Sequence, residues 1–168
     1  MGDVLDEIAD CVPALRRYAR ALTHDRESAD DLVQDCLERA IRKKGLWRPI
    51  GPLRPWLFRI LLNLHRNGLR QKRRAPPAVA LDEIGTEPAV AAGQPGRVAL
   101  AEMARAMERL PPDQREALLL VAVEGLAYAE AAAVLGIPIG TLMSRIGRAR
   151  ALLRQWTEDS GPKLRAVK

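Results

Sequence analysis

Residues 124–153 hold the feature that most restricts the fold of this chain: two helix-forming segments joined by a turn that contains glycine and proline. The first segment, residues 128–135, is rich in alanine, the strongest helix former. Gly136 follows where a helix often ends in a left-handed residue, and Pro138 is tolerated in the first turn of a new helix. The pattern predicts a helix–turn–helix.

The second helix of this motif is predicted from about Thr141 to beyond Leu153. Its apolar residues recur at i, i+4, i+7 and i+11 and define one buried face: Leu142, Ile146, Ala149 and Leu153. Such a helix lies in the DNA major groove, where arginine suits guanine and serine suits base or phosphate. The motif therefore favours DNA binding, although two short helices and a glycine also occur in ordinary helical proteins.

The charge of the chain supports a nucleic-acid partner. Its 168 residues carry a net charge of +6. Between residues 42 and 74 there are eleven lysines and arginines and no acidic residue, whereas residues 1–41 hold ten acids and five arginines. This polarity predicts a basic end that faces nucleic acid and an acidic side that faces a protein. The alternative is a solvated helix face, which the tryptophans inside the basic run make less attractive.

The remaining sequence predicts an all-α protein of two small domains. The first domain, residues 1–74, has a helix from about residue 4 to 22, a second from near Ser28 to Gly45, and a third that begins near Pro55. Ser28 and Asp31 have the spacing of a capping pair. The predicted apolar stripes of these helices are Leu5, Ile8, Val12, Leu15, Ala19 and Leu22; Leu32, Val33, Cys36, Leu37, Ala40 and Ile41; and Trp56, Leu57, Ile60, Leu61 and Leu64.

Residues 75–96 are rich in proline, alanine and glycine and are predicted to be a flexible linker. The second domain, residues 97–168, has a helix near 97–109 and another near 112–124, followed by the helix–turn–helix. Residues 118–123 are apolar all round, so the helix that contains them should be central and buried.

No catalytic or metal-binding set is evident in the sequence. His24 and His65 lie far apart with no nucleophile near them, and Cys11 and Cys36 have no partners at metal-ligand spacing. We expect both cysteines to be buried free thiols, and we expect no cofactor and no enzymatic activity. The acidic N-terminus lacks a signal peptide, and no run has the length of a membrane span, so we expect a cytoplasmic protein without membrane insertion.

Three segments in order resemble the extracytoplasmic-function (ECF) sigma factors, the small bacterial transcription initiation factors. DDLVQDCLERA (30–40) resembles the helix that binds core polymerase, and LRPWLFRILLNLHRNGLRQKRR (53–74) resembles the helix that melts the promoter and contacts the −10 element. Residues 110–153 resemble the reader of the −35 element. The resemblance implies an N-terminal domain like sigma region 2 and a C-terminal helix–turn–helix domain like sigma region 4. It also implies core RNA polymerase, promoter DNA and an anti-sigma factor as partners.

The resemblance also assigns residue roles. Those implied for core polymerase are Asp31, Leu32, Gln34 and Asp35. Those implied for the −10 element and melting are Trp47, Arg59, Asn63, Arg66 and Arg70, with Trp47 the preferred stacking platform because Trp56 lies on an apolar stripe. Those implied for the −35 element are Thr141, Ser144, Arg145 and Arg148. Met143 and Gly147 depart from the larger or basic residues frequent at these outward positions, and Ala127 replaces the usual Ser or Thr helix cap.

Two other functions fit parts of the sequence. A sigma-like decoy would sequester an anti-sigma factor without binding promoters, but it would not need the basic run of residues 42–74. A repressor that uses only the helix–turn–helix would leave the first domain unexplained.

Overall fold

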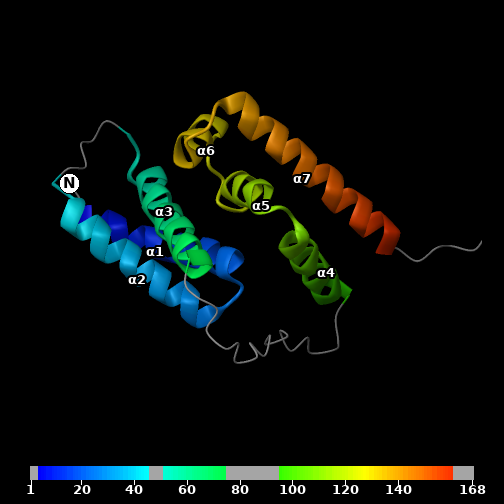
Figure 1. Ribbon diagram of the computed structural model, residues 1–168, viewed down its shortest axis with the longest axis horizontal. Helices are drawn as coiled ribbons and strands as arrows, with labels where there is room; N and C mark the ends of the chain where they lie inside the picture. Colours follow the sequence, from blue (N-terminus) through cyan, green and yellow to red (C-terminus); the bar gives the residue numbers. More distant parts are fainter. Residues whose placement is uncertain (1–3, 46–50, 75–94, 161–168) are drawn as a thin grey trace, which may run out of the picture.

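The computed structural model describes residues 4–45, 51–74 and 95–160, and these residues form helices and no strands. Three helices build the first domain: α1 (Val4–Thr23), α2 (Arg26–Lys43) and α3 (Leu53–Arg74). The second domain contains α4 (Pro95–Arg109), α5 (Pro112–Leu118), the π-helical turn η1 (Leu119–Val123), α6 (Tyr128–Leu135) and α7 (Ile139–Ser160). Figure 1 shows the two groups side by side. The predicted all-α fold is confirmed.

The core of the first domain lies where the apolar faces of its three helices meet. Tyr18 of α1 and Phe58 of α3 are both fully enclosed, and their rings pack edge to face with centroids 5.2 Å apart. Cys36 is buried beside them, and burial raises the pKa of its thiol to about 12. Cys11 is only half-buried, so the prediction of two buried thiols is right for Cys36 alone.

The N-cap of α2 lies three residues before the predicted cap, Ser28. Asp25 has an extended backbone, and its carboxylate accepts a hydrogen bond of 2.8 Å from the Ser28 backbone N–H. Asp25 is therefore the N-cap, and the predicted pairing of Ser28 with Asp31 is wrong. Both Asp and Ser are good caps, and the left-handed backbone of His24, with φ of 56°, turns the chain so that Asp25 takes the position. Leu5 and Ile41, which were placed on buried stripes, are 40% and 45% exposed because they lie near helix ends.

The helix–turn–helix forms as predicted. Gly136 ends α6 with a left-handed φ of 67°, which glycine adopts without a steric penalty. Helix α7 then begins at Ile139, two residues before the predicted start. The four residues of its predicted apolar face are all buried: Leu142, Ile146, Ala149 and Leu153.

A π-helical turn was not predicted. Helix α5 continues into η1, and the segment ends at Glu124, which is 2% exposed. Leu119 and Leu120 are buried, but Val123 is 47% exposed, so the prediction that residues 118–123 are buried all round is wrong. One side of η1 packs on the domain core, whereas Val123 lines an open groove between α1, α4 and η1.

The two domains contact each other directly. Helix α6 packs against α3, and η1 packs against α1. In Figure 1 the second domain accordingly lies against the first, with α6 next to α3. Among the described residues no single helix is long and apolar enough to span a membrane; α6 and α7 together reach that length and hydropathy, but they are bent by 99°.

Candidate nucleic-acid interface

The outward face of α7 carries a row of four polar side chains. Thr141, Ser144, Arg145 and Arg148 recur at i, i+3, i+4 and i+7, so they share one face of the helix, away from its buried stripe. Ser144 and Arg148 are exposed, whereas Thr141 and Arg145 are half-buried. We call these four residues the α7 polar row. Met143 is also exposed, at 54%, and it gives the neighbouring surface an apolar contact.

Asp113 lies beside the α7 polar row and was not singled out in the sequence. Its Oδ2 lies 3.3 Å from Nε of Arg145, whose side chain is only 22% exposed. Asp113 belongs to the first turn of α5, so the packing of α5 on α7 sets this pair. Arg145 makes no other side-chain contact with the described residues, so the two terminal amino groups of its guanidinium can bind an acceptor.

Helix α3 presents a second polar row, formed by Arg59, Asn63, Arg66 and Arg70. These residues recur at i, i+4, i+7 and i+11, so they share a face of the helix. Arg59, Asn63 and Arg70 are exposed. Arg66 is not free: its Nη2 donates a 2.6 Å hydrogen bond to Oε2 of Glu116 in the second domain. Trp47, the predicted stacking residue, lies outside the described residues.

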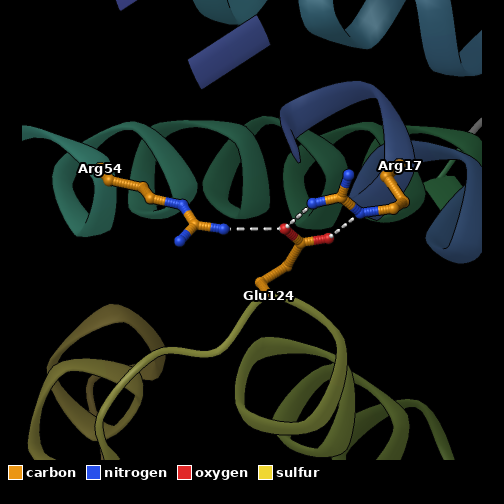
Figure 2. Close-up of polar contacts among 3 residues, drawn as sticks. All are labelled: Arg17, Arg54 and Glu124. Atoms are coloured by element: carbon orange, nitrogen blue, oxygen red, sulfur yellow. Dashed lines mark hydrogen bonds and ion pairs between the residues drawn. The ribbon is translucent and has the colours of Figure 1, made fainter. Parts of the chain in front are cut away.

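Glu124, the residue directly after η1, makes a similar contact. Figure 2 shows its carboxylate between two arginines of the first domain. Arg17 of α1 donates from Nε and Nη2 to the two oxygens at 3.1 and 2.8 Å, and Arg54 of α3 donates from Nη2 to Oε2 at 3.0 Å. The Glu124 side chain is fully buried by these contacts, and its hydrogen bond raises the pKa of Arg17.

The buried Tyr18 and the half-buried His65 lie behind these ion pairs. Tyr18 donates from its hydroxyl to the backbone carbonyl of Glu116 at 3.4 Å, across the domain boundary. Burial, and then the charge of Glu116, raises the pKa of Tyr18 well above its usual value. Burial lowers the pKa of the nearby His65, so its imidazole is neutral at pH 7. The contact between the domains is therefore both polar and desolvated.

The residues expected to bind a protein lie on α2. Asp31, Gln34 and Asp35 are exposed and recur at i, i+3 and i+4, so they form one acidic face, while Leu32 beside them is half-buried. Asp31, Leu32 and Asp35 line a hollow of about 540 Å³ between α2 and α3. In the described part of the chain, no three His, Cys, Asp or Glu side chains are grouped so that they could hold a metal ion.

Comparison with known proteins agrees with this geometry. Residues 8–62 match the family described as the Sigma2 domain of PhyR, and residues 100–153 match Sigma-70, region 4. The chain is 40% identical to the ECF RNA polymerase sigma factor EcfG of Rhodopseudomonas palustris, over 94% of this chain and 89% of that protein. It is 37% identical to the RNA polymerase sigma factor CnrH of Cupriavidus metallidurans, over 83% and 78%.

A solved structure extends the similarity to three dimensions. The sigma factor RpoE of Bartonella quintana, in complex with the anti-sigma factor NepR, superposes with a TM-score of 0.76 at 32% identity, over 94% of this chain and 98% of that one. The helix–turn–helix with its polar row, the basic α3 and the acidic face of α2 thus occur in a chain that matches sigma factors over nearly its full length. The chain belongs to the ECF RNA polymerase sigma factors, the subunits that direct core polymerase to specific promoters.

Proposed function

We propose that the two domains divide promoter recognition between them. The α7 polar row reads the −35 element, the polar row of α3 contacts the −10 element and aids melting, and the acidic face of α2 binds core polymerase. The functional units are residues 1–74 and 97–168, joined by residues 75–96. The observation that carries this proposal is the α7 polar row, which lies on the outward face of the second helix of a helix–turn–helix.

Promoter binding then requires the two domains to separate. The −35 and −10 elements lie about 25 base pairs apart, which is about 85 Å of duplex at 3.4 Å per base pair. A compact body of this length has a radius of gyration of about 15 Å and is about 40 Å across. Residues 75–96 reach about 70 Å when extended, which is enough to let the domains bind both elements. The described arrangement is therefore the closed form, and the DNA-bound form is open.

We also propose an anti-sigma factor as a partner, because the related RpoE was solved with one. The groove between α1, α4 and η1 has a volume of about 930 Å³ and is mostly apolar. It contains the exposed side chains of Leu100, Met103 and Val123. These features suit the apolar face of an amphipathic helix. A location in the cytoplasm, where polymerase and DNA are found, and the absence of catalytic activity follow from the same proposal.

The decoy function has one observation in its favour: residues 8–62 match the Sigma2 domain of PhyR, and a solved PhyR structure is described as an anti-anti-sigma factor in complex with the anti-sigma factor NepR. The 40% identity to a sigma factor over 94% of the chain favours promoter recognition. A decoy would bind an anti-sigma factor but would not support transcription with core polymerase.

Run-off transcription with core polymerase on a genomic promoter library tests the proposed function. The wild-type chain should select a set of promoters with a common −35 sequence. The double variant Arg145→Ala/Arg148→Ala should lose that selectivity and still bind core polymerase in a pull-down. Arg150→Ala is the matched control, because Arg150 is an exposed base on α7 outside the α7 polar row. Selectivity that survives the double variant would show that another face reads the DNA.

A further inference from the structure

Glu124 has an unusual position for a carboxylate in a DNA-binding domain. It lies at the boundary of its own domain, yet its side chain is fully buried. Among the described residues, both side-chain partners of its carboxylate, Arg17 and Arg54, belong to the other domain. Along the chain, Glu124 lies 107 residues from Arg17 and 70 residues from Arg54. The carboxylate is thus an acidic group that the second domain inserts into a basic site on the first.

The basic site is built on two rigid helices. Arg17 projects from α1 and Arg54 from α3, and their Nη2 atoms meet at the same oxygen, at 2.8 and 3.0 Å (Figure 2). Arg54 is also held over the ring of the buried Phe58, 5.6 Å from its centroid. A fork of guanidinium groups in this arrangement binds a phosphate as readily as a carboxylate. We call Arg17 and Arg54 the arginine fork.

We propose that the arginine fork is a binding site for a backbone phosphate of promoter DNA and that Glu124 occupies it in the closed protein. The proposal rests on the proposed function, which makes promoter DNA the ligand of the first domain. Glu116 covers Arg66 of the α3 row in the same way, with a hydrogen bond of 2.6 Å. In the closed form the guanidinium groups of three arginines are therefore paired with carboxylates, and opening the domains releases them together.

The exposure of the fork makes this occupancy reversible. The side chains of Arg17 and Arg54 are 53% and 40% exposed, so solvent screens their attraction to Glu124. When polymerase holds the two domains apart, Glu124 becomes solvated. Each arginine can then bind a DNA phosphate, which releases the counterion condensed on that phosphate. The same groups thus hold the free protein closed and bind DNA when it is open.

The test is the salt dependence of binding between the full chain and a mixed-sequence single-stranded DNA, without polymerase. Glu124→Gln keeps the shape of the side chain and removes its charge. Freeing two phosphate-binding groups should make the slope of log affinity against log salt steeper by about 1.4. Between 50 and 200 mM salt, this variant should therefore lose about sevenfold more affinity than the wild type. The triple variant Arg17→Gln/Arg54→Gln/Glu124→Gln should return to the wild-type slope.

Glu38→Gln is the matched control. It also removes one negative charge and frees one arginine, because Glu38 pairs with Arg42 at 3.5 Å, but Arg42 is already 79% exposed. A slope for Glu124→Gln no steeper than that of Glu38→Gln would overturn the proposal. A triple variant as steep as Glu124→Gln would overturn the phosphate site, because the gain would come from other bases.

A second measurement tests the site if the Glu124→Gln variant does not fold. With the polymerase holoenzyme on a promoter, Arg17→Gln/Arg54→Gln should give a shallower salt slope than the wild type, and an unchanged slope would refute the site. Because the single-stranded DNA assay uses no polymerase, its result is independent of the transcription test of the proposed function.

Discussion

The pair of Asp113 and Arg145 bears on the contact that we propose between Arg145 and the −35 element, because it holds the arginine side chain before DNA binds. We consider the substitution Asp113→Ala. In the free protein the pair joins side chains that are 50% and 22% exposed at 3.3 Å, so its loss should change the free energy of unfolding by less than about 1 kcal/mol. Folding should therefore be nearly unaffected.

DNA recognition should change more than stability. An arginine side chain carries about 2 kcal/mol of rotamer entropy, and a residue already held by Asp113 has lost part of it. If half is lost before binding, releasing Arg145 costs about 1 kcal/mol of specific affinity, which is about fivefold. Removing the Asp113 charge also strengthens nonspecific attraction to phosphate. Both effects lower the ratio of specific to nonspecific binding.

The assay is fluorescence anisotropy of the polymerase holoenzyme on matched and mismatched −35 duplexes at one salt concentration. The specificity ratio should fall at least about fivefold for Asp113→Ala. Glu102→Gln on α4, which removes one exposed charge away from the α7 polar row, is the control for charge alone. In a double-mutant cycle, the effect of Asp113→Ala on specificity should fall to that of the charge control Glu102→Gln once Arg145 is alanine. A ratio that is unchanged, or an effect larger than that of Glu102→Gln that persists without Arg145, would refute the orienting role of Asp113.

Three further predictions concern stability. Ala127 has the extended backbone of an N-cap but no side chain that can cap α6. Ala127→Ser should therefore stabilise the second domain by about 1 kcal/mol and raise Tm by about 2–4 °C in calorimetry. No increase would show that the contact of Glu130 with the Ala127 N–H already satisfies the N-terminus of α6. Phe58→Ala should cost about 3–5 kcal/mol in denaturant unfolding because the ring is fully buried against Tyr18, and a loss below about 1 kcal/mol would contradict the described core. Burial lowers the pKa of His65 in the folded state, so the unfolded chain binds a proton at this residue at a higher pH than the folded chain does. The contribution of His65 to the free energy of unfolding is therefore fully present above about pH 6.5 and is lost as the pH falls towards the folded pKa. Urea midpoints from pH 7.5 to 5.5 should fall less for His65→Gln than for the wild type, and equal slopes would exclude this origin.

Local spacing predicted most of the helices and the surfaces on them. The apolar period placed the buried stripe of α7. Gly136 marked the turn because only a residue without a Cβ adopts its left-handed backbone at no cost. Prediction from local sequence failed where one pattern is compatible with two structures. Asp25 and Ser28 are both good caps, and an apolar run such as residues 118–123 is compatible with either an α-helical or a π-helical turn.

The sequence by itself therefore determined the secondary structure, the two domains and the family, because each depends on the order of residues within one helix or turn. Only the tertiary structure decided which charges meet. Glu116 reaches Arg66 across 50 residues, and Glu124 reaches Arg54 across 70. An ion pair between two domains produces no periodic pattern in the sequence, because each charged residue would be equally compatible with a solvated helix face. Whether the basic helix of the first domain faces DNA or its own partner domain is set by the packing of α6 on α3 and η1 on α1, which buries the carboxylates where the guanidinium groups converge.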